Sequence, residues 1–358
     1  MRIQPRFAGM EVVSALGADL DAFTSAIKSG IGGLGVQPDG AWLGNIPHPA
    51  WDGPGDVLAE FLVRVLESTC RRAGEHPDVL ADPDTALIVA TTKGDISGLL
   101  AAGGSTSLGP FLARVRRAAG HRGHAELVSA ACASGAVAIA RASRLLEEGF
   151  GRRVLVLGFD RLDPFLAKGF GCLGALGTTA CRPYDGSRDG LSLGEAAAAV
   201  LLVDDHVPGV RLAGVGLAGD AFTIVRPCDD GSGLALAMAR ASADSGGREV
   251  DAICGHGTAT VANDAMEIAA FRAFFPGGAP PVFGLKGATG HTLGACGVLE
   301  AVACVLAING GYIPGTVGFT ANDSGIDIVA STRHVAPGRI MTVNAGFGGL
   351  DAALVLEG

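Results

Sequence analysis

The sequence predicts an α/β protein built from two similar halves. Residues 125–160 have the pattern of a strand, a tight turn of small residues, a helix and a second strand, which is the unit of a parallel sheet. Residues 281–310 repeat the order of strand, small-residue turn, long apolar helix and glycine. We therefore expect an internal duplication, with one half over residues 1–203 and the other over residues 204–358, packed face to face.

In the first half, hydrophobic spacing and turn residues predict the elements. Apolar residues at helical spacing indicate helices, and continuous apolar runs rich in β-branched residues indicate buried strands. A region rich in glycine, proline and tryptophan indicates a loop. The expected order is strand 10–14, helix 20–29, loop 30–56, helix 57–73, strand 84–92, strand 125–132, helix 133–149 and strand 152–160.

The second half shows the same alternation of strands and helices. Its longest apolar segment, residues 293–309, contains Glu300 and several glycines, so we interpret it as a buried core helix and not as a membrane span. The expected order is strand 250–258, helix 263–275, strand and loop 281–292, helix 293–310, and a strand, glycine turn and final strand within 339–358.

Composition argues against several classes of protein. The chain has 358 residues, 48% of them hydrophobic and 18% charged, which is enough to bury a large core. Its net charge is −9 and its pI is about 5.3, whereas binders of nucleic acid or anionic membranes are generally basic. The first residues lack the charged start and apolar stretch of a signal peptide. We therefore expect a cytoplasmic protein that binds neither nucleic acid nor membrane.

The eight cysteines form no recognisable disulfide or metal pattern. No CxxC pair is present, and no spacing of cysteine and histidine suits zinc. We expect reduced thiols, most of them buried as small apolar residues, and no bound metal. The cysteines are residues 70, 132, 172, 181, 228, 254, 296 and 304.

Cys132 is the candidate nucleophile, because it follows a predicted strand and opens a predicted helix. Unsatisfied N–H groups and the partial positive charge of a helix N-terminus stabilise a thiolate, so we expect a lowered pKa. Its small neighbours in ACASG (131–135) let a substrate carbonyl approach, and its N–H can donate into an oxyanion hole. Taken alone, however, a buried structural cysteine explains this position better.

Two histidine motifs change that balance. GHGTAT (255–260) places His256 directly after an apolar strand, and KGATGHTLGACG (286–297) places Lys286 five residues before His291. A single histidine near a strand end is usually a structural residue. Here two histidines, a lysine and a cysteine all lie at strand ends of a duplicated α/β chain, which is where the active sites of open sheets gather.

Taken in order, these motifs resemble those of the elongating β-ketoacyl-[acyl carrier protein] synthases. The resemblance spans nearly the whole chain and includes the opening segment VSALGADLDAFTSAIKSGIGGLG (13–35). It implies the thiolase fold, in which two βαβαβαββ halves make a five-layer α-β-α-β-α sandwich, normally in a dimer. The motifs are ACASG (131–135), RPYDGSRDGLSLGE (182–195), GHGTAT (255–260), LKGATGHTLGACG (285–297) and NAGFGG (344–349).

The resemblance implies a role for each matching residue. Cys132 matches the acylated nucleophile, and His256 and His291 match the two catalytic histidines. Phe347 matches a gating phenylalanine whose N–H joins that of Cys132 in the oxyanion hole. The other matches are Lys286, which supports the second histidine electrostatically, the acidic residues Asp264, Glu267 and Glu300 near that lysine, and Thr258 and Thr260, whose hydroxyls bond the phosphopantetheine arm.

Three further assignments rest on weaker signals. Phe170 and Cys172 are candidates for lining an acyl pocket, and core packing explains them equally well. RPYDGSRDG (182–190) is interpreted as a structural turn that contacts between aspartate and arginine hold near the substrate tunnel.

The resemblance also implies a reaction, a decarboxylative Claisen condensation. Cys132 would take an acyl group from acyl carrier protein and pass it to malonyl-loaded carrier protein, which leaves as the 3-oxoacyl product. No metal or redox cofactor is needed, because the phosphopantetheine belongs to the substrate. The expected partners are acyl- and malonyl-loaded carrier proteins, and either a second copy of this chain or another ketosynthase-like subunit.

The chain departs from the family pattern at positions that bear on the substrate. It is shorter than typical members around residues 36–56 and 93–124 and in loops after residue 204. Gly174 stands where an arginine is often found, and NAGFGG stands where the family has NSFGFGG, which removes one bulky aromatic at Ala345. We hypothesise a reshaped pocket and a role in polyketide or polyene-type synthesis in preference to ordinary fatty-acid synthesis.

Alternatives stay open at this point. A chain-length-factor-like accessory subunit would resemble a synthase but lack the nucleophilic cysteine, whereas this chain has Cys132. Other thiolase-fold enzymes use Cys-His-Asn or a second cysteine near the C-terminus. Here His291 stands in a GHT motif, and Asn344 begins a terminal glycine motif without cysteine. A pure binding module would leave four catalytic-type residues unexplained. Acyl length and unsaturation do not follow from the sequence.

Overall fold

The computed structural model contains a ten-stranded sheet that consists of two groups of five strands. The register pair that joins the two groups is Arg6 with Arg211. Parts of the shortened regions 36–56 and 93–124, and residues 205–207, lie outside the described residues. The structure describes residues 4–48, 51, 53, 55–96, 108–204, 208–220 and 222–358.

The first group of strands comes from the N-terminal part of the chain. Strand β4 lies parallel to β5 and β6, while β8 runs antiparallel to β6 and β1. The order across the sheet is β5-β4-β6-β8-β1. The strands are β1 (Arg6–Ser14), β4 (Thr85–Ala90), β5 (Ala125–Val128), β6 (Arg153–Asp160) and β8 (Ala196–Val203).

The second group repeats this topology strand by strand. Strand β10 lies parallel to β11 and β12, while β13 runs antiparallel to β12 and β9, in the order β11-β10-β12-β13-β9. The shared order agrees with the expected duplication, and the division of the chain at residue 203 stays a prediction. The strands are β9 (Arg211–Gly219), β10 (Ala252–Cys254), β11 (Val282–Phe283), β12 (Arg339–Gly346) and β13 (Leu350–Glu357).

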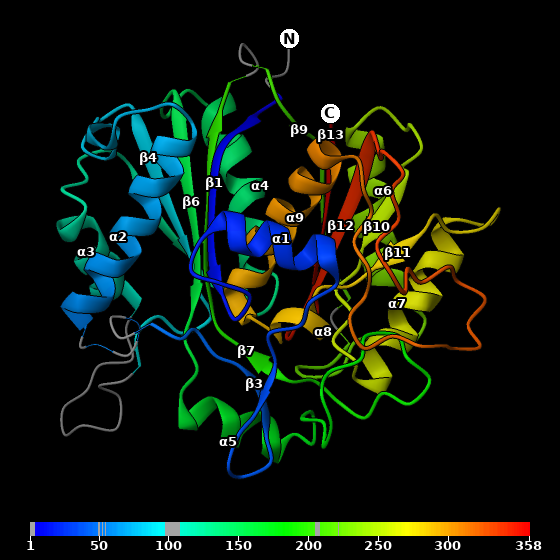
Figure 1. Cartoon of the computed structure of the whole chain (residues 1–358). Coiled ribbons are helices and arrows are strands. Elements are labelled where there is room, and N and C mark those ends of the chain that lie inside the picture. The colour runs from blue at the N-terminus through cyan, green and yellow to red at the C-terminus, as the bar shows by residue number, and fades with distance from the viewer. Residues whose placement is uncertain are drawn as a thin grey trace.

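Helices form three layers around the two groups of strands (Figure 1). Helices α2 and α3 share an apolar core with the first group, and α6 and α7 share one with the second. Helices α4 and α9 lie between the groups and share a core with both, which gives the expected five-layer α-β-α-β-α sandwich. These helices are α2 (Gly55–Arg72), α3 (Leu108–Ala118), α4 (Ser134–Glu147), α6 (Ser232–Asp244), α7 (Val261–Phe274) and α9 (Cys296–Gly310).

Shorter elements complete the fold. The helix expected at residues 20–29 is confirmed as α1, which Asp19 caps by accepting from the N–H of Ala22. Strands β2, β3 and β7 form a small separate sheet, and two of them lie in the region expected to be a loop. These elements are α1 (Leu20–Ser29), β2 (Gly35–Val36), β3 (Trp42–Gly44), a 3₁₀ turn (Pro77–Leu80), α5 (Pro164–Cys172), β7 (Leu193–Gly194), α8 (Lys286–Thr289) and a second 3₁₀ turn (Leu293–Ala295).

Helix α9 passes through the middle of the molecule. The window Leu293–Gly310 is long and apolar enough to cross a membrane by length and composition, yet 78% of it is buried inside the protein. This burial agrees with the core helix expected from the sequence. A Cβ added at Gly135 of α4 would lie 2.7 Å from the backbone N of Val298. Glycine therefore lets the N-terminal turns of α4 and α9 meet.

Two strands are shorter than expected because the chain turns early into the loops at the sheet edge. Strand β5 stops at Val128, and β10 covers residues 252–254 only. Ala131 has a φ of 47°, and Ala259 has a φ of 64°. This left-handed conformation does not continue a strand, so both apolar runs contain a strand followed by a strained loop.

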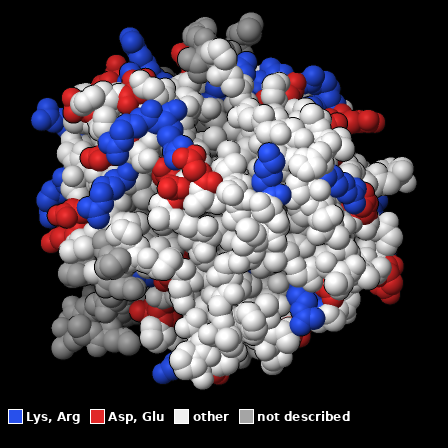
Figure 2. All heavy atoms as spheres, in the orientation of Figure 1, with Lys and Arg blue, Asp and Glu red and all other residues white. Residues whose placement is uncertain are grey.

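The surface carries charges of both signs. On the face shown in Figure 2, acidic and basic side chains are interspersed along the upper and left margins, and the centre is mostly uncharged. Interspersed signs are typical of a solvated protein surface and differ from the continuous basic stripe of a nucleic-acid binder.

Candidate active site

A cavity of about 400 Å³ is lined by residues that follow strands in both halves. Cys132 comes from the first half, and His256, His291 and Phe347 come from the second. In open α/β sheets, ligands bind outside the carboxyl ends of the strands. The structure therefore brings these four candidate residues, from both halves, into one space.

Cys132 lies in a strained turn between β5 and α4. The Ser134 hydroxyl donates to the carbonyl O of Ala131 at 2.6 Å and accepts from the N–H of Ala130 at 2.8 Å, which fixes the turn. Such strain persists only where surrounding contacts impose it, and it gathers at functional sites. Among the described residues, the non-glycine positions with positive φ are Ala131, Tyr184, Ala259 and Leu293, all in segments that carry or support the site.

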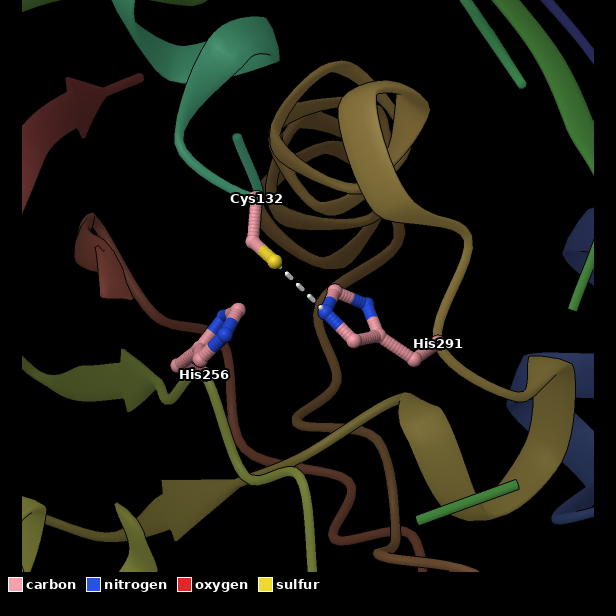
Figure 3. A group of neighbouring side chains, drawn as sticks. All are labelled: Cys132, His256 and His291. Atoms are coloured by element: carbon pink, nitrogen blue, oxygen red, sulfur yellow. Dashed lines mark hydrogen bonds between the residues drawn. The ribbon is translucent and has the colours of Figure 1, made fainter. Parts of the chain in front are cut away.

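The thiol of Cys132 faces two imidazoles (Figure 3). Its Sγ lies 3.0 Å from Nε2 of His291. The rings of His256 and His291 meet edge to face, with centroids 5.3 Å apart and an interplanar angle of 86°. All three side chains are buried, with 5% or less of each residue exposed. All three line the cavity.

Contacts on the far side of each ring determine the tautomers of the histidines. The ammonium of Lys286 lies 3.1 Å from Nδ1 of His256, and the N–H of Leu293 lies 3.3 Å from Nδ1 of His291. Both groups only donate, so both Nδ1 atoms accept, and in a neutral ring the proton is on Nε2. Burial and the charge of Lys286 lower the pKa of both histidines well below the usual value. The cavity therefore receives two neutral Nε2–H donors.

The pKa of Cys132 differs from the expectation. Burial raises it to about 11, although Lys286 and the backbone N–H groups of Phe347 and of Cys132 itself oppose this rise. The prediction of a lowered pKa considered the helix N-terminus and omitted desolvation, which is the larger effect here. The resting cysteine is therefore a thiol, and the N–H groups near its sulfur are available for an oxyanion.

Lys286 links His256 to Glu300. Its Nζ donates to Oε1 of Glu300 at 2.6 Å, and it also contacts Nδ1 and the carbonyl O of His256. Burial disfavours the ammonium, but Glu300, together with Cys296 and Glu267, outweighs this effect and raises the pKa of Lys286, which therefore keeps its charge. The resemblance implied support for the second histidine. The charge of Lys286 acts on His291 through space, in agreement with that expectation, and its direct contact is with His256.

The three acidic candidates have two different roles. Only Glu300 contacts the lysine directly, whereas Asp264 and Glu267 hold the loop that carries His256. Glu267 accepts from the N–H groups of His256 and Gly257, both at 2.7 Å. Asp264 accepts from the backbone of the same loop at 3.1 Å. Glu267 still lies close enough to Lys286 to interact with its charge, so it acts both on the lysine and on backbone N–H groups.

Two buried residues that the sequence analysis did not assign a role support the site. Asp160 ends β6 and accepts from the N–H of Gly294 at 2.7 Å, in the turn that follows His291, and it pairs with Lys93 at 3.0 Å. Asn344 donates to Oε2 of Glu300 at 2.6 Å. The sequence offered one signal for both residues, because each is a polar residue at or near the end of an apolar strand. A polar side chain buried there needs a hydrogen-bond partner.

Of the residues expected to bind the phosphopantetheine arm and the acyl group, all but Cys172 line the cavity. Thr258 and Thr260 line the cavity, with hydroxyl oxygens 2.9 Å apart. Phe170 and Phe347 also line it, and their rings stack with centroids 5.7 Å apart. Cys172 is exposed at the end of α5 and is not part of the cavity wall, so its assignment to an acyl pocket does not fit the structure.

The two single-residue departures from the family pattern fall on the cavity. Gly174 and Ala345 are part of its wall, so the space next to them is wider than with larger side chains. The motif 182–190 forms the structural turn that was expected. In it, the N–H of Tyr184 donates to Asp264 at 2.7 Å, and Arg188 lies 3.6 Å from the same carboxylate.

The thiol and the two imidazoles could also be considered as metal ligands. Cys132, His256 and His291 each offer one ligand atom, and these atoms lie within 4.8 Å of one another. The ammonium of Lys286 lies directly behind His256 and repels a cation. The group therefore fits hydrogen-bond donation to a developing anion better than metal binding.

Comparisons with known proteins identify the family of this chain. The models of the β-ketoacyl synthase N-terminal and C-terminal domains match residues 55–206 and 210–320. A 3-oxoacyl-[acyl-carrier-protein] synthase 2 of Rhizobium meliloti is 32% identical over 84% of this chain and 81% of its own length. The chain belongs to the β-ketoacyl synthase family.

Two further similarities define how far the likeness extends. A 3-oxoacyl-[acyl-carrier-protein] synthase 2 of Vibrio harveyi is 34% identical over 66% of this chain, and the match spans 63% of that protein. The fold is that of the solved ishigamide ketosynthase/chain length factor, with a TM-score of 0.90 and 24% identity over 100% of this chain and 99% of that one. This structural similarity establishes the thiolase fold that the sequence implied.

Proposed function

We propose that this protein catalyses the decarboxylative condensation of a Cys132-bound acyl group with malonyl-loaded carrier protein, forming a 3-oxoacyl thioester. The observation that carries this proposal is the Sγ of Cys132 at 3.0 Å from Nε2 of His291, with a second neutral histidine beside it. Two neutral N–H donors next to a nucleophile suit a reaction that forms an enolate and then attacks an acyl-enzyme.

The first half-reaction transfers the acyl group. The Sγ of Cys132 attacks the acyl thioester, and the pantetheine sulfur leaves. The proton of the Cys132 thiol ends on the released pantetheine thiol, so the step is balanced. The N–H groups of Cys132 and Phe347 interact with this sulfur and can receive the carbonyl oxygen as it becomes negative.

The second half-reaction forms the carbon–carbon bond. The malonyl thioester loses carbon dioxide, and its enolate oxygen accepts from the Nε2–H groups of His256 and His291. The carbanion attacks the Cys132 thioester, and the tetrahedral intermediate expels the thiolate, which takes one proton from solvent. Each donor stabilises the enolate by about 3 kcal/mol, as single oxyanion donors do elsewhere.

The partners follow from the same proposal. The substrate thioesters reach the cavity on acyl carrier protein, with Thr258 and Thr260 bonding the phosphopantetheine arm. No metal or redox cofactor takes part. The protein acts in the cytoplasm, as a homodimer or paired with another ketosynthase-like subunit. The names of the Vibrio harveyi protein and of the ishigamide ketosynthase/chain length factor support these two kinds of partner.

A polyketide or polyene-type pathway is the proposed context. Gly174 and Ala345 line the cavity, and the family resemblance implies larger groups at both positions. The alternative is an accessory subunit like a chain length factor. The assembled thiol, imidazoles and lysine favour the catalytic role, since an accessory subunit has no use for a buried ammonium behind a histidine.

Intact-mass measurement after incubation with acyl-loaded carrier proteins tests the proposal. We expect an acyl adduct on the wild type that is absent in Cys132→Ala. The control is Cys172→Ala, since Cys172 is exposed outside the cavity and would carry any non-specific adduct. An adduct that disappears in Cys172→Ala and persists in Cys132→Ala would contradict the assignment, and no adduct with any donor would favour the accessory subunit.

A further inference from the structure

Asp351 is a buried carboxyl group in the cavity that the reaction above does not use. It lies near the start of β13, is 4% exposed, and lines the same space as Cys132. Within the described part of the chain, its side chain makes no hydrogen bond or ion pair, and its pKa responds to burial and to Asp220 alone. A buried carboxylate without a partner is unfavourable, so its presence points to a ligand.

Asp220 lies beside it on the cavity wall. A Cβ added at Gly233 would lie 2.5 Å from Oδ2 of Asp351 and 2.7 Å from Cβ of Asp220, so both side chains border one small space. The oxygens of Asp220 accept from the N–H groups of Phe222 and Cys228 at 3.1 and 2.9 Å, which fixes its orientation. Burial and Asp220 together raise the pKa of Asp351 to about 7.

The other charged side chains of the cavity wall do not neutralise this pair. Among the described residues that line the cavity, Arg226 is the only one that is a lysine or an arginine. Its guanidinium lies 2.8 and 2.9 Å from the carboxylate oxygens of Asp229. Asp189 also lines the cavity, and it accepts from Thr178 and Thr179. Asp351 and Asp220 therefore form an acidic region that faces the substrate space.

We propose that Asp351 and Asp220 form a subsite for an N–H donor of the thioester substrate, with an amine on the acyl group as the favoured source. This inference rests on the proposed function, since it assumes that the cavity receives thioesters. An ammonium complements two adjacent carboxylates in both charge and hydrogen bonding. The amides of the pantetheine arm offer weaker N–H donors of the same kind, and they are the second source to be tested.

Acylation kinetics with matched substrates test the subsite. Pairs of acyl-pantetheine thioesters that differ only in a terminal amine, over a series of chain lengths, are compared in wild type and Asp351→Asn. We expect Asp351→Asn to lower kcat/KM for the amine-bearing thioester about 10- to 100-fold relative to its alkyl partner, the value of one charge-assisted hydrogen bond. Asp323→Asn is the matched control, because Asp323 is exposed and makes no contact with the cavity wall.

The outcomes separate the two sources. An equal loss of kcat/KM for both thioesters would support the subsite and identify the pantetheine amides as its N–H donor. No loss for either, in a variant that melts as a folded protein, would overturn the proposal. Binding of the same thioesters to Cys132→Ala, measured by calorimetry in wild-type and Asp351→Asn backgrounds, gives the comparison without any reaction. A failure of the condensing activity is thereby distinguished from a failure of the subsite.

Discussion

Each half pairs a lysine with a buried carboxylate near the strand ends, and the two pairs differ in what they hold. In the first half, Lys93 contacts Asp160 at 3.0 Å, and Asp160 also accepts from the backbone of the turn after His291. In the second half, Lys286 contacts Glu300 at 2.6 Å and reaches a histidine directly. The same topology therefore supports a pair that positions backbone and a pair that polarises a reacting group.

The largest effect is expected from Lys286→Met. This change removes the donor to Nδ1 of His256, so the proton of that imidazole is no longer held on Nε2. It also leaves Glu300 buried without its cation. We expect condensation to fall about 1000-fold, since a wrong histidine tautomer costs as much or more in other enzymes. The free energy of unfolding should fall by about 3 kcal/mol, the usual cost of leaving one partner of a buried ion pair alone. Carbon dioxide release and urea denaturation measure the two effects.

Lys93→Met is the matched control for this comparison. It unpairs a carboxylate in the first half, but Asp160 keeps its backbone donors. Condensation should then stay within about tenfold of wild type, because no donor to the substrate is lost. Equal catalytic losses in both variants would show that the two pairs do not differ in function.

His256→Ala should separate the two half-reactions. His256 donates only towards the malonyl group in the proposed mechanism, whereas His291 also contacts the Sγ of Cys132. We expect decarboxylation to fall about 100-fold, the effect of removing one oxyanion donor, while acylation of Cys132 changes little. Quenched mass measurements follow acylation and carbon dioxide release follows decarboxylation. A comparable loss in both steps would contradict this division of roles.

Asp160→Asn should have a smaller effect on catalysis. The amide keeps the shape of the side chain but weakens the acceptor for Gly294, three residues after His291. We expect kcat to fall about tenfold with KM nearly unchanged, since a misplaced donor acts on the transition state and not on binding. Asp78→Asn, on an exposed side chain, is the control. A rise in KM at unchanged kcat would mean that Asp160 shapes the substrate cavity instead.

Local sequence motifs were sufficient to predict the residues that meet at the cavity. Cys132, His256 and His291 each stand in a short motif at the end of an apolar run, and a duplicated sheet brings such ends together. Lys286, from the same motif as His291, lies behind His256. The same motifs predicted the layers of the fold and the order of strands and helices in both halves. The strand boundary was wrong where a left-handed residue follows the strand, as Ala131 follows β5, because strain imposed by distant contacts is not visible in a local pattern.

Long-range contacts explain what the sequence did not predict. Asp160 acts on Gly294, which is 134 residues away in the chain, so its role appears only in the folded protein. Asp351 lies in an apolar strand segment and gains its meaning from a cavity that other segments form. The pKa of Cys132 was wrong for a related reason. A helix N-terminus is visible in sequence, whereas the burial that outweighs it is a property of the packed site.

Two carboxyl groups, one in each half, have pKa values shifted in opposite directions. Arg141 lowers the pKa of Glu126 in β5 to about 2, so this pair adds stability above the unfolded value of 4.5 and loses it as the pH falls towards 2. Burial raises the pKa of Asp351 in β13 to about 7. Between pH 4 and 7, folded Asp351 retains its proton while the unfolded chain releases it. Ionisation thus favours the unfolded chain, and the free energy of unfolding falls as the pH rises through that window.

The smallest expected effect follows from this contrast and is read from melting temperatures against pH. Asp351→Asn removes a buried ionisable group, so it should melt close to wild type at pH 4 and about 2 °C above it at pH 8. Glu126→Gln should show the reverse, with a deficit that appears as the pH rises from 2 to 5 and then stays constant. A carboxylate with a structural role would give Asp351→Asn a lower melting temperature at every pH. A stabilised variant that also loses preference for the amine-bearing thioester would therefore show that Asp351 is retained for its ligand, at a cost to the fold.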